Sequence, residues 1–174
     1  MRTIYLLIAL VTFNLSAQEI KKVDSERSII NYTGKHFLHK WSAENKNISG
    51  LIQIENETIS NIGVIAKVSD FRSGNSNLDS NSLRVLDALK FPNVIFRSTS
   101  INQEDGQIKI DGKMNFHGIE KDINISAKVV QLDGSIQLSG KFSVSLTEFL
   151  VDRPSLLTMK VDDEINLEFE LYFN

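Results

Sequence analysis

Apolar and polar side chains alternate along several long segments of this chain. The pattern is clearest over residues 108–116, 136–146 and 165–173, where every second residue is apolar or glycine. Successive side chains of a β-strand point to opposite faces, so each segment is predicted to form a strand with one apolar and one solvated face. Strands in series must stack or close to bury their apolar faces. The pattern therefore predicts an all-β, antiparallel barrel or sandwich.

Weaker versions of the same alternation predict further strands. They lie within residues 19–33, 47–55, 61–71, 93–101 and 123–129. The Asp-Gly pairs at 105–106 and 133–134 predict hairpin turns, because this pair readily adopts the backbone conformation of such turns. Residues 35–41 do not alternate cleanly and are interpreted as a bend or bulge. We therefore expect about eight strands, mostly joined by hairpins.

Residues 79–89 are predicted to form a helix, because three leucines recur there at helical spacing. These are Leu83, Leu86 and Leu89. Asp79 or Ser80 is suited to cap its start. Phe91 is expected to end it, because the residue before a proline, here Pro92, is disfavoured in the helical region. The chain thus carries one short helical insertion between strands.

The N-terminus has the features of an export signal. Arg2 is followed by a short apolar core at 5–11 and by a small-residue cleavage site at 15–17. The apolar core is too short to span a bilayer as a helix. We expect residues 1–17 to be the signal peptide and residues 18–174 to form a single exported domain, periplasmic or secreted.

Composition excludes several classes of function. The chain has a net charge of −3, and loss of the single base Arg2 with the signal, with no acid lost, moves it to −4. A mildly acidic domain without a basic run is not expected to bind nucleic acid. The absence of cysteine excludes thiol catalysis, iron–sulfur ligation and disulfides. No G-x-S-x-G nucleophile motif is present, so we expect no catalytic residues and no enzyme.

The three histidines are the only candidates for a transition-metal site. His36 and His39 have a helical spacing within a segment that reads as extended, and His117 is distant in sequence. No carboxylate accompanies them in a recognised ligand pattern. We therefore expect neither a metal nor a cofactor.

Several motifs resemble those of one protein family. Residues 23–28, 32–36 and 48–50 are similar to its N-terminal signatures, residues 91–98 to its FPxIxFxS segment, and residues 112–121 to its GxLTxxGxTK hairpin. With the helical insertion and the closing strands, the resemblance extends over essentially the whole chain after the signal. In their order and spacing, these motifs resemble those of the YceI-like, polyisoprenoid-binding periplasmic proteins.

The resemblance implies a lipocalin-like antiparallel barrel with a helical insertion. It also implies that the barrel binds a long isoprenoid chain, such as a polyprenyl lipid or a quinone tail. The chain departs from the family pattern in places: residues 147–151 replace its usual Asp-Phe-Gly turn, its usual Arg-Asp pair reads Arg84-Val85, the helix is short, and the chain is on the small side for the family. These departures leave the length of the cavity, and of its ligand, open.

The candidate ligand-binding residues lie on the apolar strand faces, the helix and the segment 35–41. They are Phe37, Trp41, Phe71, Leu83, Leu86, Leu89, Phe91, Phe96, Phe116, Gly140, Phe142 and Phe149. Glycines on apolar faces, at Gly50, Gly112 and Gly140, are compatible with room for a ligand, although glycines in strands also serve bends and bulges. His36 and Arg84 are the candidates for contact with its head group.

Three classes of function are compatible with an exported, strand-rich chain. Periodicity alone favours a barrel packed solid, an exported interaction module without ligand, whereas the resemblance favours an exported soluble binding protein for an isoprenoid lipid. An outer-membrane barrel is disfavoured, because one Trp and three Tyr are too few for two aromatic girdles. The expected partners are the isoprenoid lipid and, transiently, a membrane. Transport and storage are both open, as is the oligomeric state.

Overall fold

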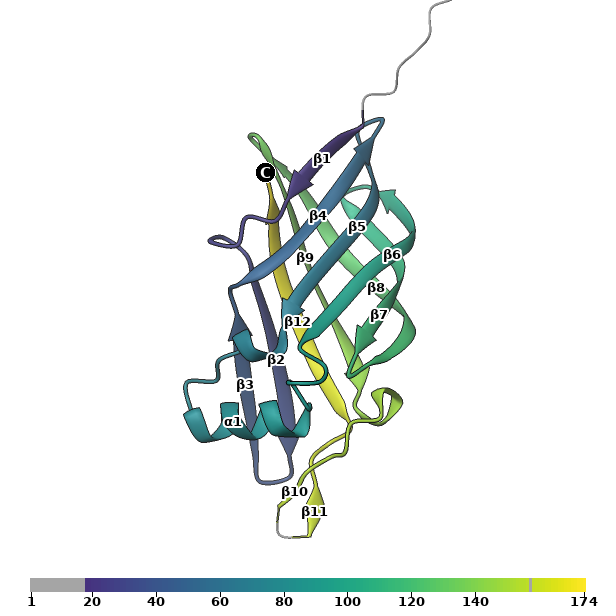
Figure 1. Cartoon of the computed structure of the whole chain (residues 1–174). Helices are drawn as coiled ribbons and strands as arrows, with labels where there is room; N and C mark the ends of the chain where they lie inside the picture. The colour runs from purple at the N-terminus through teal and green to yellow at the C-terminus, as the bar shows by residue number, and fades with distance from the viewer. Residues whose placement is uncertain (1–17, 157) are drawn as a thin grey trace, which may run out of the picture.

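The computed structural model describes residues 18–156 and 158–174, so the predicted export signal lies outside the described residues. An antiparallel sheet of ten strands curls into a half-barrel (Figure 1). In spatial order the strands are β1 (Glu19–Lys22), β4 (Ile48–Glu55), β5 (Thr58–Lys67), β6 (Asn93–Glu104), β7 (Gln107–Phe116), β8 (Ile119–Leu132), β9 (Ser135–Ser145), β12 (Glu164–Phe173), β2 (Ile29–His36) and β3 (His39–Asn45). The predicted all-β antiparallel fold is confirmed.

The two edges of the sheet are tied to other parts of the curl. Val23, just after β1, forms a β-bridge with Phe173 of β12 at one end of the molecule. Glu44 of β3 forms a second bridge with Arg72 at the other end. The sheet therefore encloses an interior although its edge strands β1 and β3 are not neighbours in it.

Tight turns join most of the strands, as the sequence predicted. Asp105 and Gly106 between β6 and β7 have φ of 48° and 75°, and His117 and Gly118 between β7 and β8 have 53° and 76°. Two consecutive positive φ values match the right-handed twist of the flanking strands, which favours Asp or Asn followed by glycine. Gly134, with φ of 75°, turns the chain between β8 and β9.

The sequence prediction was wrong for residues 35–41, which form a hairpin rather than a bend. His36 of β2 pairs directly with His39 of β3, leaving Phe37 and Leu38 at the tip. The inward face of β3 carries Trp41 but then only a small and a polar residue, so its alternation is weak in the sequence. This strand and the four-residue β1 account for the count of ten rather than eight.

The helix α1 spans Ser76–Val85, beginning and ending earlier than the predicted 79–89. Its cap is Asn75, whose side chain accepts hydrogen bonds from the backbone N–H groups of Asn77 and Leu78. Asp79 does not cap the helix start. It accepts from the backbone N–H and the hydroxyl of Ser73, at 2.9 and 2.5 Å, and so ties the preceding loop to the helix.

Two short 3-10 turns and a small hairpin complete the end of the barrel near α1 (Figure 1). The turns are η1 (Val68–Asp70) and η2 (Thr147–Phe149), and the hairpin joins β10 (Ser155–Leu156) to β11 (Met159–Lys160). Across the part of the chain that the structure describes, no helix is both long and apolar enough to cross a membrane.

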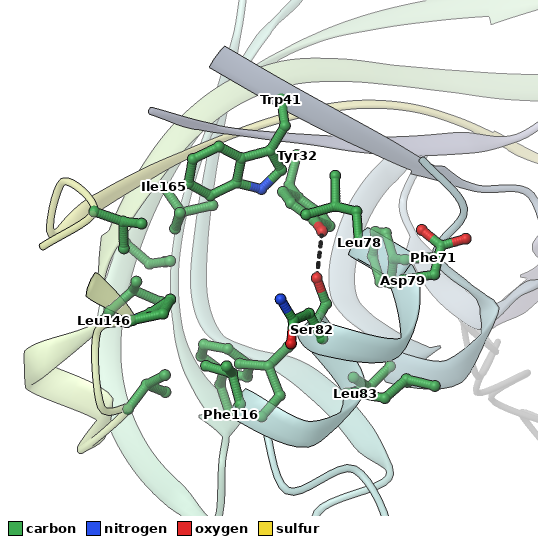
Figure 2. Close-up of a pocket in the computed structure, with 18 of the residues that line it drawn as sticks. Tyr32, Trp41, Phe71, Leu78, Asp79, Ser82, Leu83, Phe116, Leu146 and Ile165 are labelled. Carbon is green, nitrogen blue, oxygen red and sulfur yellow. Dashed lines mark hydrogen bonds between the residues drawn. The ribbon is translucent and has the colours of Figure 1, made fainter. Parts of the chain in front are cut away.

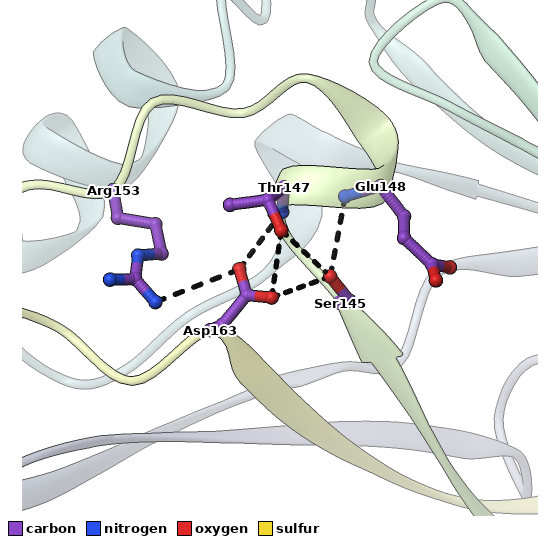
Figure 3. A network of polar contacts seen from close by, with 5 residues as sticks. All are labelled: Ser145, Thr147, Glu148, Arg153 and Asp163. Carbon is purple, nitrogen blue, oxygen red and sulfur yellow. Dashed lines mark hydrogen bonds and ion pairs between the residues drawn. The ribbon is translucent and has the colours of Figure 1, made fainter.

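Asp163 stabilises this end of the barrel, because its hydrogen bonds connect β9 and η2 to the residue just before β12 (Figure 3). Its carboxylate accepts from the Ser145 hydroxyl at 2.6 Å and from the backbone N–H and hydroxyl of Thr147 at 2.9 and 2.8 Å. Arg153 adds an ion pair at 3.9 Å. The hydrogen bond from Ser145 is the main reason that the pKa of Asp163 lies below its ordinary value.

Candidate ligand-binding cavity

A cavity of about 330 Å³ lies inside the barrel at the end covered by α1 (Figure 2). Figure 2 shows apolar side chains from opposite sides of the barrel facing one common space. They include Trp41, Phe71, Leu78, Leu83, Phe116, Leu146 and Ile165. The volume falls at the lower end of the range of about 300–1,000 Å³ that is usual for small-molecule sites.

Helix α1 forms one wall of the cavity. Leu78, Ser82 and Leu86 line it at intervals of four residues, the spacing of one helix face, and Leu83 lies beside them. No residue of α1 is fully buried. The helix therefore lies over the end of the barrel as a cover, while the strands form the interior.

A few polar groups lie in this apolar wall, between α1 and β2. The Tyr32 hydroxyl lies 3.5 Å from the Ser82 hydroxyl (Figure 2), and the Tyr32 ring packs against Phe71 with centroids 5.5 Å apart. Burial raises the pKa of Tyr32 above its usual value, so its phenol is protonated at neutral pH and available as a donor.

The charge around the cavity suits an uncharged ligand. Among the lining residues in the described ranges there is no lysine or arginine, whereas Asp79 is present. The hydroxyl and backbone N–H of Ser73 hold the pKa of Asp79 below its ordinary value, so this carboxylate is ionised at neutral pH.

His36 is a buried polar residue at the rim of the cavity, 2 % exposed. Its Nε2 lies 3.1 Å from the backbone carbonyl of Met159, and because a carbonyl only accepts, Nε2 must donate. Nδ1 is buried and has no hydrogen-bond partner among the described residues. The bond fixes the β2–β3 hairpin against the β10–β11 hairpin.

The structure does not bring the three histidines together. The rings of His36 and His39 lie 5.9 Å apart at the rim, whereas Nδ1 of His117 is bonded to the carbonyl of Phe149 at 3.1 Å. Within residues 18–156 and 158–174, no group of three histidine, aspartate or glutamate side chains is placed to hold a metal ion.

The cavity is lined by five of the eleven aromatic and leucine side chains that the sequence singled out. Those that line it are Trp41, Phe71, Leu83, Leu86 and Phe116, together with His36. Phe149 is buried behind Phe116, with ring centroids 5.4 Å apart. Phe91 packs against His117 instead and covers Gly118.

Three other candidates lie at the surface. Phe37 is 53 % exposed at the tip of the β2–β3 hairpin, and Leu89 is fully exposed in the turns after α1. Leu89 faces solvent because the helix ends at Val85, so the leucine periodicity no longer applies there. Arg84 is exposed and donates to the Asn81 side chain at 2.6 Å rather than lining the cavity.

Phe96, Phe142 and Gly140 do not line the cavity, but follow the lining residues Val94 and Val144 on the inward faces of β6 and β9. The space beside Gly140 is filled by Phe169, since an added Cβ would come 2.8 Å from that ring. Gly112 is covered by Phe96, and Gly50 faces the backbone of β5. These glycines therefore accommodate neighbouring groups of the protein, and the interpretation that they leave room for a ligand was wrong.

Sequence reasoning missed several lining residues. Tyr32, Leu78, Ser82, Val144, Leu146, Ile165 and Leu167 all face the cavity. The alternation placed the last four on inward strand faces, but it does not distinguish the open end of a barrel from its packed end. A sequence prediction with Asn75 as the helix cap would have included Leu78 and Ser82 in the helix and placed them on its inner face.

Comparison with known proteins places the chain in a family. Residues 22–173 match the YceI-like domain. The protein YceI of Salmonella newport is 23 % identical over 116 residues, which cover 63 % of this chain and 61 % of that protein. The match thus spans less than two thirds of the length of this relative.

Solved structures share the fold at low sequence identity. BcnA of Burkholderia cenocepacia superposes with a TM-score of 0.78 at 18 % identity, covering 86 % of this chain and 98 % of that one. A polyisoprenoid-binding domain from Saccharophagus degradans gives 0.73 at 10 % identity, covering 88 % and 97 %. The Campylobacter jejuni YceI protein gives 0.64 at 17 % identity, covering 98 % and 91 %. The match over residues 22–173 shows that the chain belongs to the YceI-like domain family.

Proposed function

We propose that this protein binds the apolar chain of an uncharged isoprenoid lipid or quinone in its barrel cavity, without metal, cofactor or catalysis. The observation that carries the proposal is an interior cavity lined mainly by apolar side chains under a helical cover. The neighbour from Saccharophagus degradans, described as a polyisoprenoid-binding domain, supports the ligand class. Each buried methylene contributes about 0.8 kcal/mol, so few polar contacts are needed.

The volume of the cavity also argues against the alternative function, a ligand-free interaction module. A solid-core interaction module predicts no sizeable interior space, whereas about 330 Å³ is open beneath α1. The absence of lysine and arginine from the described lining residues favours an alcohol or quinone head over a phosphate. Tyr32 and Ser82 are the hydroxyls best placed to bond such a head. His36, which lines the edge of the cavity, is a further polar residue that such a head could meet.

We further propose that the protein is exported and carries or stores its ligand in the periplasm or outside the cell. The basis is the signal-like segment 1–17. Mass spectrometry of the mature N-terminus tests this step directly. A chain beginning at Gln18 supports export, and a cell-associated chain that retains Met1 contradicts it.

Exposed apolar side chains support a transient contact with a lipid bilayer at the cavity end. Phe37 and Leu38 at the β2–β3 tip, Leu150 after η2 and Met159 in β11 form this apolar rim, each between 47 % and 69 % exposed. Apolar side chains gathered at one end of a molecule commonly mark an interaction site, whereas singly scattered ones do not. Because the ligand itself is a membrane component, a bilayer is the partner that this rim fits.

The first test is organic extraction of the protein, purified without detergent from its native host, followed by mass spectrometry. A stoichiometric isoprenoid alcohol or quinone is expected. A folded protein with an empty extract, which also fails to take up any prenol in vitro, would overturn the proposal in favour of a ligand-free interaction module.

A further inference from the structure

The cavity stops partway along the barrel, within one inward residue pair on neighbouring strands, because the lining residue Leu167 of β12 pairs with Phe142 of β9, and Phe169 pairs with Gly140. On β12, Ile165 and Leu167 line the cavity, whereas the next inward residue, Phe169, lies beyond it. On β9, Val144 lines the cavity and the next inward residue is Phe142. The rings of Phe142 and Phe169 lie 6.2 Å apart, so they close adjoining parts of the barrel cross-section.

A third ring closes the opposite side of the barrel. On β6, Val94 lines the cavity and Phe96 is the next inward residue, 8 % exposed. Its ring leans over Gly112 of β7, where an added Cβ would come 2.6 Å from the ring. We call Phe96, Phe142 and Phe169 the aromatic floor of the cavity.

Glycines allow two of these rings to lie against the barrel wall. Phe169 occupies the position over its cross-strand partner Gly140, and Phe96 lies over Gly112, which is two residues from its own cross-strand partner Met114. A ring packed on a glycine of the neighbouring strand is held between fixed backbone groups. The two glycines therefore help to close the cavity.

Beyond the floor, the interior is packed. Ile52, Ile108, Leu138 and Phe173, from four different strands, are each at most 1 % exposed. A ligand chain that passed the floor would have to displace these side chains, and protein interiors of this density do not yield such space readily. The ligand is therefore confined to the end of the barrel near α1.

We propose that the aromatic floor sets a maximum length for the ligand chain, so that this protein takes an uncharged isoprenoid of only a few units. The inference rests on the proposed function and specifies its ligand. The ten-residue strand β12 is about 33 Å long, at about 3.3 Å per residue. Its cavity-lining residues Ile165 and Leu167 occupy only the first part of that length.

The test uses the fluorescence of Trp41, which lines the cavity and is the single tryptophan of the chain. The mature protein is titrated with prenols of two, three, four and nine isoprene units. The affinity should rise with length among the short prenols and then stop rising. An affinity that increases by at least tenfold from four to nine units would overturn the length limit while leaving the proposed function intact.

Two matched variants separate the floor from general loosening of the barrel. Phe142→Ala should move the length at which the affinity stops rising upward by at least one isoprene unit. Phe173→Ala, in the packed half of the barrel, should leave that length unchanged. If either alanine variant does not fold, Phe142→Leu and Phe173→Leu replace the pair. A Phe142 variant with the wild-type profile contradicts the inference. If no prenol of any length binds, the proposed function itself fails.

Discussion

The ring of Phe169 lies directly over Gly140, its cross-strand partner, so closely that an added Cβ would come 2.8 Å from the ring Cζ. The backbone carbonyl of Ser126 lies at the same 2.8 Å on the other side of that position. Gly140 is thus enclosed by the protein itself, between a floor residue and a neighbouring strand.

Replacing Gly140 by alanine should therefore lower the free energy of unfolding. Overpacking of this kind costs about 1–3 kcal/mol, because the ring or the backbone must shift. Urea unfolding of the two proteins measures the difference. Gly63→Ala is the matched control, since nothing lies within 4 Å of its added Cβ, and it should leave stability unchanged or raise it slightly. Equal losses in both variants would show that the contact with Phe169 is not the cause.

The difference between predicting strands and predicting the cavity has a physical origin. Alternation is a local property, and it located the strands around Phe142 and Phe169 correctly. Whether an inward ring closes a barrel or lines a space depends on what stands opposite it on the next strand. The pairing of Phe169 with Gly140 joins residues far apart in the chain, so no local pattern contains it.

The helix start illustrates a second limit. Asn75 and Asp79 are both residue types that cap helices, and each lies before apolar residues at helical spacing. Asn75 accepts the first-turn N–H groups and is the cap, whereas the Asp79 carboxylate is bonded to Ser73. That bond forms only when the loop has folded back, which is why the sequence placed the helix too late.

The Tyr32 hydroxyl should contribute to binding of an isoprenoid alcohol but not of a hydrocarbon. Tyr32→Phe removes a partly buried donor that faces Ser82, and loss of one hydrogen bond costs about 1 kcal/mol, or about fivefold in affinity. Titration with farnesol and with a farnesene of equal length measures the two cases. A similar loss for both ligands would mean that Tyr32 acts through packing alone.

Asp163 should make stability depend on pH in the acid range. Its pKa is lowered in the folded protein, so the carboxylate stabilises the fold above its unfolded pKa of about 3.9, and this contribution is lost as pH falls through the lower folded value. At neutral pH, Asp163→Asn should cost about 1 kcal/mol, a figure reduced for the partial exposure of the side chain. The variant should lose less stability than the wild type between about pH 5 and pH 2.

Urea unfolding at several pH values compares the two proteins. Asp122→Asn is the control, because Asp122 is 86 % exposed and pairs only with Lys113 and not with the η2 turn. Its effect at neutral pH should stay within about 0.5 kcal/mol. If Asp163→Asn and the wild type lose stability in parallel on acidification, the contacts with Ser145 and Thr147 do not carry the effect.

The apolar rim should govern the rate at which ligand leaves a membrane rather than the affinity of the folded site. Phe37 and Leu38 lie at a hairpin tip and are more than half exposed, so replacing both by serine leaves the cavity lining intact. The transfer of a prenol from vesicles to the protein is measured by the fluorescence of Trp41. Its rate should fall by about tenfold, the factor expected when about 1.4 kcal/mol of interfacial contact is lost.

Leu132→Ser, at the β8–β9 turn, is the control for loss of an exposed leucine, and it should take up prenol at the wild-type rate. If the double variant transfers normally, or loses affinity for prenol in free solution, the rim does not act by touching the bilayer.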